Sequence, residues 1–432
     1  MEISKEAEAL NAGLQQAHPQ VFSMLSKKGR SFFFPKLGIL SQTAEAKGKK
    51  MNATIGICLE EDGSPMRLQS IQQHLTLNPG EIYPYAPSFG SPQLREQWKS
   101  MLLSKNPSLQ GKEFSLPIVA CGLTNAVAVA AAMFVDSGEK VITPDYYWEN
   151  YDLTIAQGCN ASLVKFSTFK GSRFNIEGLR GKLLSKGEKK VVILNFPNNP
   201  TGFTLRKEEA PKVVEVIREA AEKGKHIVVL LDDAYFGLVF EEDALQESLF
   251  GMLAGLSPNV LAVKIDGATK EDFAWGLRVG FLTFAAKDAA KECYAPLENK
   301  AAGALRGSIS NASNLSQSLV LKAYRSGAYQ EEKKAKFELL KKRFDEVKRV
   351  LAAHPEFREE FVPEPFNAGY FLCFKLKHAD AEAVRKKLLE TYSTGIIAFG
   401  SIIRFAFVAL PLAGIEPAVT NIFSACRDCR KP

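Results

Sequence analysis

The stretch Leu261–Phe281, LAVKIDGATKEDFAWGLRVGF, is the part of the chain around which the predicted fold is built. It begins and ends with apolar runs, 261–263 and 279–281, and both are typical of short buried strands. The polar segment between them carries Lys270 and, eight residues later, Arg278. We predict a loop here, in which Lys270 points into a cleft or into water. A lone loop lysine is usually solvated, so a function for Lys270 depends on what other stretches place beside it.

Strand and helix patterns alternate along the chain before this stretch. This alternation predicts an α/β fold in which a parallel sheet has helices on both faces. We expect strands at 53–59, 116–120, 140–143, 190–196 and 226–231, and helices at 91–103, 126–134 and 211–222. Residues 1–30 are expected to form a charged helical arm.

Polar residues follow several of these predicted strands, at the edge where parallel α/β sheets bind ligands. The turn Gly122-Leu123-Thr124 precedes a helix, whose N-terminus offers free N–H groups and a positive dipole end to an anion. The segment 195–202, NFPNNPTG, is predicted to be a rigid turn. Asp232 emerges directly from an apolar strand, so we expect it to have a cationic partner.

The pattern changes after residue 311. Residues 313–354 read as largely helical, with apolar positions at helical spacing in the second half. A strand at 369–374, a helix at 380–391, a strand at 402–407 and a last helix at 417–426 follow. This part is predicted to be a smaller α+β domain.

Composition excludes several classes of function. The chain has 432 residues, enough for two domains, and its net charge of +7 is spread in short clusters without interleaved aromatic residues. We therefore expect no nucleic-acid binding. The seven irregularly spaced cysteines favour a reducing compartment, and the pair Cys426-x-x-Cys429 has no second pair for a metal site. No apolar run is long enough to span a membrane, and no signal peptide is recognisable, so we expect a cytoplasmic protein.

With these motifs in view, the chain resembles a fold-type I, class I/II aminotransferase of the aspartate/aromatic type that depends on pyridoxal 5'-phosphate. The resemblance rests on PNNPTG (197–202), DDAY (232–235) and the pair Lys270 and Arg278, in the order of the family and close to its spacings. It covers roughly residues 50–410. It implies a large domain with a mostly parallel sheet (61–312), preceded by an arm and part of the small domain (1–60). An interdomain helix and the rest of the small domain would follow (313–432).

The resemblance also implies a role for each site residue. Lys270 would form the Schiff base and move the proton, and Asp232 would pair with the pyridine nitrogen. Asn199 and Tyr235 would bind the phenolic oxygen, and Tyr146 would stack on the ring. The phosphate would be held by Gly122, Leu123, Thr124, Thr269 and Arg278, with Tyr85 reaching it from the neighbouring subunit of a homodimer. Arg404 would bind the substrate α-carboxylate.

The sequence departs from the family at three positions of the expected site. Gly267 stands where a phosphate-binding serine is frequent, Leu123 stands where a small residue is usual, and Cys58 stands where a glycine is frequent. Arg306 resembles an arginine that binds a side-chain carboxylate across the dimer, and an ordinary surface arginine fits the sequence equally well.

The expected reaction is ping-pong transfer of an α-amino group between an amino acid, aspartate or aromatic, and a 2-oxo acid such as 2-oxoglutarate. Two alternatives remain open. One is another enzyme with the same cofactor, a β-lyase or an aminocyclopropane-type synthase. The other is a ligand-sensing regulator on the same scaffold, which would need a DNA-binding domain ahead of residue 50.

Overall fold

The computed structural model describes residues 3–35, 38–289 and 291–430. Seven strands of this part form one sheet, in the order β2-β10-β9-β8-β7-β3-β4. All pairs are parallel except those of β10, which runs antiparallel to β2 and β9, so the predicted mostly parallel sheet is confirmed. The strands are β2 (Ile118–Cys121), β3 (Lys140–Pro144), β4 (Ser162–Phe166), β7 (Lys189–Asn195), β8 (His226–Asp232), β9 (Val260–Gly267) and β10 (Val279–Ala286).

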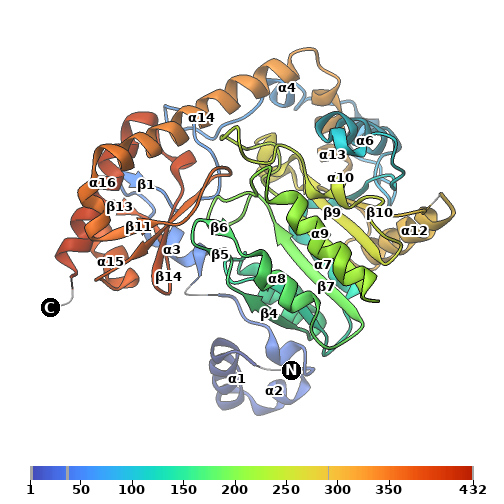
Figure 1. Ribbon diagram of the computed structural model, residues 1–432, viewed down its shortest axis with the longest axis horizontal. Coiled ribbons are helices and arrows are strands. Elements are labelled where there is room, and N and C mark those ends of the chain that lie inside the picture. Colours follow the sequence, from blue (N-terminus) through green and yellow to red (C-terminus); the bar gives the residue numbers. More distant parts are fainter. Residues whose placement is uncertain (1–2, 36–37, 290, 431–432) are drawn as a thin grey trace.

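Helices cover both faces of this sheet (Figure 1). Side chains alternate across a strand, and in β7 Val192 and Leu194 join the core beneath one face while Val191 and Ile193 join the core on the other. Helix α9 (Ala210–Glu222) packs in the first core and α7 (Gly122–Phe134) in the second. Helices α8 (Ile176–Leu183), α10 (Leu249–Leu253) and α12 (Lys291–Ser308) complete these layers.

A second, antiparallel sheet is built from the C-terminal part of the chain, in the order β11-β12-β15-β14. The long helix α14 (Tyr329–Ala353) runs from the large sheet toward it (Figure 1). The N-terminal β1 (Met51–Asn52) pairs in parallel with β13 (Thr394–Gly395), so residues near 50 join this part of the molecule. The domain boundaries at 60 and 312 stay predictions. The other elements here are β11 (Phe361–Pro363), β12 (Leu372–Leu376), β14 (Ile397–Phe399), β15 (Ile402–Phe405), α15 (Ala381–Thr391) and α16 (Ile415–Asp428).

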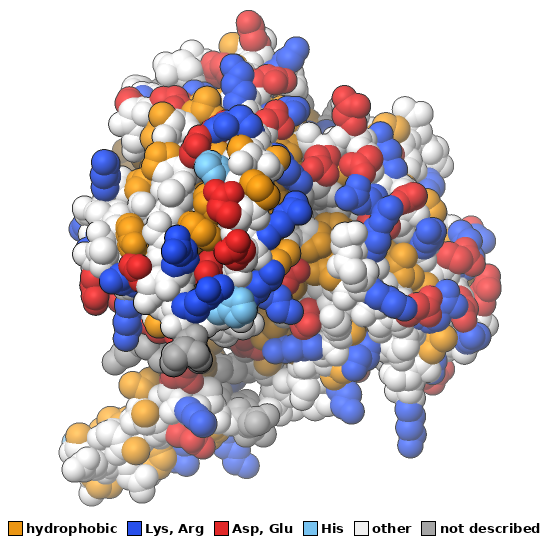
Figure 2. Space-filling model, turned by 60° about the vertical axis from the view of Figure 1, so that its left-hand side comes forward, with side chains coloured by type: hydrophobic (Ala, Val, Ile, Leu, Met, Phe, Trp, Pro, Cys, Tyr) orange, Lys and Arg blue, Asp and Glu red, His pale blue; other side chains and the backbone are white. Residues whose placement is uncertain are grey.

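The remaining helices lie at the N-terminal arm and around the large sheet, except the helix at 39–45, which lies against β13 and β14. They are α1 (Lys5–Ala17), α2 (Pro19–Met24), α3 (Ile39–Glu45), α4 (Gln69–Gln72), α5 (Pro79–Ile82), α6 (Pro92–Lys105), α11 (Ala268–Glu271) and α13 (Asn314–Tyr324), and the short strands β5 (Phe169–Lys170) and β6 (Arg173–Phe174) form a hairpin. Figure 2 shows acidic and basic side chains interspersed on one face, above a projecting arm that carries hydrophobic side chains. Among the described helices, none has the length and apolar character that a membrane span requires.

Two predictions of local structure are wrong. Residues 53–59 form no strand beyond an isolated bridge at Leu59, because part of this backbone bonds to side chains of the site. The carbonyl of Thr54 accepts from Arg404 and that of Gly56 accepts from Lys270. Lys270 itself is not in an open loop, since it lies in the one-turn helix α11. The predicted helix at 126–134 begins earlier than expected, at Gly122.

Gly202 joins the two parts of the molecule. It has a φ of +73°, and a Cβ there would lie 1.9 Å from the carbonyl oxygen of Phe371. Its own carbonyl accepts hydrogen bonds from the N–H groups of Asn367 and Ala368. The turn 197–202 is therefore packed directly against the chain that leads into β12.

We expect Gly202→Ala to lower the free energy of unfolding by about 3 kcal/mol, because the methyl group overpacks this contact and the φ disfavours alanine. Urea denaturation followed by fluorescence and circular dichroism measures the change. The control is Gly13→Ala in α1, where a Cβ meets nothing within 4 Å. Equal stability of the two variants would contradict the packing argument.

Candidate active site

A cavity of about 320 Å³ opens where β7, β8 and β9 end. The parallel register aligns Asn195 with Asp232 and Asp232 with Ile265, so residues that follow these strands meet at one place. Nine of the predicted site residues line it: Leu123, Thr124, Asn199, Asp232, Tyr235, Thr269, Lys270, Arg278 and Arg404.

Lys270 lines the cavity from helix α11. Its Nζ donates to the carbonyl oxygen of Gly56 at 2.8 Å and lies 5.3 Å from the ring centre of Tyr235. Burial disfavours the ammonium form and lowers the pKa of Lys270 to about 8. At pH 7 roughly a tenth of the amine is then uncharged and nucleophilic, far more than for a lysine with its ordinary pKa.

Asp232 faces the cavity from the end of β8. The hydroxyl of Tyr151 donates to its Oδ2, and the N–H of Ala234 donates to its Oδ1 at 3.2 Å. Burial raises the pKa of Asp232 to about 6, and the hydrogen bond from Tyr151 opposes that shift. The neighbouring Asp233 points elsewhere, toward Lys264 and toward Ser248 Oγ at 2.6 Å. Only the first of the two acids lines the cavity.

One end of the cavity is suited to an anion. Helix α7 begins at Gly122 and places Leu123 and Thr124 in the wall. A Cβ on Gly122 would lie 2.5 Å from a guanidinium nitrogen of Arg278, so glycine is what allows the arginine to lie against the helix N-terminus. The buried Oγ1 of Thr269 has no hydrogen-bond partner among the described residues. Helix dipole, guanidinium and unpaired hydroxyl together favour a phosphate or carboxylate.

Arg404 lines the cavity from β15. Its guanidinium donates to Asn199 Oδ1 and to the carbonyl of Thr54, both at 3.0 Å, and lies 4.1 Å from the ring centre of Phe371. Its buried Nε has no hydrogen-bond partner within the described chain. Burial lowers the pKa of Arg404, although it stays a cation. A buried guanidinium without a carboxylate partner favours an incoming anion.

The structure places Tyr146 outside this cavity. Its hydroxyl donates to Glu364 Oε1 at 2.8 Å, and its ring packs against Phe169. Trp148, two residues later, lines the cavity instead. Sequence reasoning also missed Tyr151, the donor to Asp232. The signal was the spacing of three between the aromatic residues Trp148 and Tyr151, which is typical of two side chains on one face of a helical turn.

Tyr85 and Arg306 also lie outside the cavity. Tyr85 is 89% exposed. Arg306 stands near the end of α12, a helix that the sequence reading did not predict, and its guanidinium donates to Ser310 Oγ at 2.7 Å. Gly122 does not line the cavity itself but lies directly against Arg278. Within a single chain, therefore, the cavity is formed without Tyr85, Arg306 and Tyr146.

Comparisons with known proteins agree with this geometry. Residues 48–422 match the family model described as aminotransferase class I and II. An aspartate aminotransferase of Streptomyces avermitilis is 30% identical over 57% of this chain and 60% of its own length. A probable aspartate/prephenate aminotransferase of Aquifex aeolicus is 27% identical over 46% and 48%. The chain thus spans about half the length of the curated relatives it matches.

A solved structure supports the fold over a longer range. The crystal structure of an aminotransferase from Anaerococcus prevotii superimposes with a TM-score of 0.83 at 24% identity, covering 94% of this chain and all of that one. The likeness at this identity concerns the fold. Together with the family match over most of the chain, it places the protein in the class I and II aminotransferase family.

Proposed function

We propose that this protein is an aminotransferase that uses pyridoxal 5'-phosphate. The observation that carries the proposal is the convergence of a half-buried lysine, a buried carboxylate and the N-terminus of helix α7 in one cavity. The cofactor requires these three groups, for its aldehyde, its ring nitrogen and its phosphate. The family to which the chain belongs supports the same conclusion.

The residues of the cavity fit this cofactor. The unpaired Thr269 Oγ1, the N-terminus of α7 and Arg278 offer donors to a phosphate. Asp232 offers a carboxylate to a protonated ring nitrogen, and Asn199 and Tyr235 offer donors to the phenolic oxygen. Trp148, in place of Tyr146, would lie on the ring face. When bound, the cofactor supplies an electron sink for the electrons of the substrate α-carbon.

The protein's own groups would perform the remaining steps. Lys270 would attach the cofactor and then move a proton to and from the substrate α-carbon, for which a pKa near neutrality is suited. Arg404 would bind the α-carboxylate through its unpaired Nε and orient the α-carbon toward Lys270. Ping-pong exchange between an amino acid and a 2-oxo acid follows from these roles.

We further propose a homodimer with shared sites. The support is a run of exposed large side chains in one stretch of the chain, Leu75 at 63%, Tyr83 at 80% and Tyr85 at 89%, which a partner subunit could cover. Tyr85 would reach the phosphate in the partner's cavity, and Arg306 would reach the side-chain carboxylate of the substrate there. Aspartate or aromatic amino acids, with 2-oxoglutarate as acceptor, are the proposed substrates.

The wild-type protein is expected to show the visible absorbance of bound pyridoxal 5'-phosphate and to lose it when an amino-acid donor is added without acceptor. Lys270→Ala should abolish turnover, because among the lysines only Lys270 lines the described cavity. Lys225→Ala, whose Nζ contacts only the carbonyl of Gly187 in the described chain, is the control. Full turnover in Lys270→Ala would end the proposal, and release of ammonia without an amino product would indicate a lyase.

Substitution of the adjacent acids Asp232 and Asp233 provides a second test of the proposed function. Asp232→Asn should lower kcat by about a hundredfold or more with little change in cofactor affinity, because the charge beside the ring nitrogen is lost while the phosphate contacts remain. Asp233→Asn should instead lower the free energy of unfolding by about 3 kcal/mol, because Lys264 loses its closest partner. Kinetics and urea denaturation of both variants separate these effects, and a reversed pattern would contradict the assignment.

Arg306→Ala should weaken dicarboxylic substrates such as aspartate and 2-oxoglutarate by about tenfold or more in kcat/KM, because a charge-assisted bidentate pair is lost. Phenylalanine and tyrosine should be affected much less. A panel of amino acids assayed with both proteins measures the contrast, with Arg325→Ala as the control. An equal loss for both substrate classes would indicate a structural role, and no loss would place the determinant elsewhere.

A further inference from the structure

Two acids directly follow Lys270 in the sequence, and both are buried away from the cavity. Glu271 and Asp272 are 4% and 0% exposed. They form, with Lys105 of α6 and with Lys333 and Tyr329 at the start of α14, a group that we name the buried ion cluster. None of these five residues lines the cavity.

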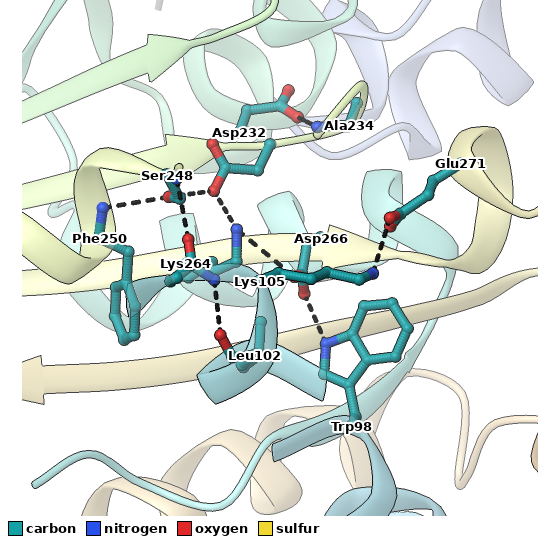
Figure 3. Close-up of polar contacts among 12 residues, drawn as sticks. Trp98, Leu102, Lys105, Asp232, Ala234, Ser248, Phe250, Lys264, Asp266 and Glu271 are labelled. Carbon is teal, nitrogen blue, oxygen red and sulfur yellow. Dashed lines mark hydrogen bonds and ion pairs between the residues drawn. The ribbon is translucent and has the colours of Figure 1, made fainter. Parts of the chain in front are cut away.

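Glu271 connects three parts of the fold. Its Oε1 accepts from Lys105 Nζ at 2.7 Å, a contact drawn in Figure 3, and also from Lys333 Nζ. A Cβ on Gly237, two residues after Tyr235, would lie 2.6 Å from the same oxygen, so the carboxylate packs against the loop that follows β8. Burial alone raises the pKa of Glu271, but the ammonium groups of Lys105 and Lys333 outweigh it and lower the pKa to about 2.

Asp272 is also fixed by hydrogen bonds and an ion pair. The hydroxyl of Tyr329 donates to its Oδ1 at 2.6 Å, that of Tyr324 donates to its Oδ2 at 2.7 Å, and Lys333 Nζ lies 3.2 Å from its Oδ1. Both carboxylate oxygens are therefore paired. Helix α11, which carries Lys270 and Glu271, is thus attached to α6 and to α14 by the two residues that follow the lysine.

This arrangement is costly for stability alone. Buried ion pairs pay a desolvation penalty, and apolar residues of similar size usually stabilise a core as well or better. A helix of one turn also cannot hold its own direction, because so few backbone hydrogen bonds offset the cost of nucleating it. Directional charge-assisted contacts hold such a turn in a single orientation.

We propose that Glu271 and Asp272 are positioning residues, which hold the turn that carries Lys270 so that its amine points into the cavity and stays shielded from water. The proposal rests on the proposed function of Lys270. It predicts that loosening the cluster moves the amine toward solvent while the rest of the cavity stays in place.

Other charged groups contribute to the electrostatics near the turn. A second ion cluster near the ends of β8 and β9 joins Lys264 to Asp233 and Asp266. In this second cluster, Trp98 Nε1 donates to Asp266 at 3.1 Å (Figure 3). On the cavity side, Lys270 faces Asp232, Arg278, Arg404 and Cys58. A test must therefore change the cluster without changing its net charge.

The test variant is the pair Glu271→Gln and Lys105→Met, which removes one acid and one base together. The matched control is Glu298→Gln with Arg95→Met, because this pair also joins α6 to another helix, at 2.7 Å, and in the described chain it makes no hydrogen bond or ion pair with residues 268–272. The readout is the pH midpoint for acetylation of Lys270 by acetic anhydride in the full-length, cofactor-free protein, measured by peptide mass spectrometry. Thermal midpoints and kcat are recorded for the cofactor-loaded proteins.

The acetylation midpoint of Lys270 is expected to rise by about one pH unit in the test variant, because the amine loses its shielding from water. The kcat should fall about tenfold. The control pair should keep the wild-type midpoint and kcat even if its thermal midpoint falls. An unchanged acetylation midpoint in the test variant would overturn the proposal, whatever its stability.

Asp272→Asn with Lys333→Met is the second variant if the first double variant does not fold, because it also removes one acid and one base and leaves the pair of Glu271 and Lys105 intact. The same rise in midpoint supports the proposal and the same absence of change overturns it. Failure of the proposed function is recognised separately. A wild-type protein that acquires no visible absorbance with pyridoxal 5'-phosphate refutes the function, while the acetylation midpoints still decide the positioning role.

Discussion

The site depends on the parallel register of β7, β8 and β9. Asn195 pairs with Asp232 and Asp232 pairs with Ile265, so the three strands end at the same level. The amide of Asn195 donates to the backbone carbonyl of Asp232 at 2.7 Å and accepts from the N–H of Asn199 at 2.7 Å, which ties the turn after β7 to the end of β8. A shift of one residue would send Asp232 to the opposite face of the sheet.

Side chains alternate across a strand, so the adjacent acids Asp232 and Asp233 lie in two different electrostatic environments. Asp232 faces the cavity, where its buried carboxylate is hydrogen-bonded but has no cation within salt-bridge distance in the described chain. Asp233 faces the interior beneath the sheet and pairs with Lys264. One acid therefore remains available to a ligand, while its neighbour is used by the fold.

The C-terminal part of the molecule completes the cavity by side chains that reach back to the large sheet. Arg404 from β15 contacts Asn199 after β7, and the hydroxyl of Tyr370 donates to the backbone carbonyl of Lys270 at 2.7 Å. Carbonyl oxygens of the segment 53–59 accept one hydrogen bond each from Arg404 and Lys270. These contacts explain why that segment, although apolar and strand-like in sequence, joins neither of the two larger sheets.

Local patterns in the chain are enough to predict the alternating α/β order, the mostly parallel sheet and the identity of the residues at the strand ends, because periodicity and turn chemistry are local properties. The three-dimensional packing is needed to show that Trp148 and not Tyr146 lines the cavity, and that Tyr151 pairs with Asp232. It alone also placed the charged side chains of Lys264 and Glu271 in the interior. Such choices depend on which partner lies across the fold, and partners distant in sequence leave no mark in the local pattern.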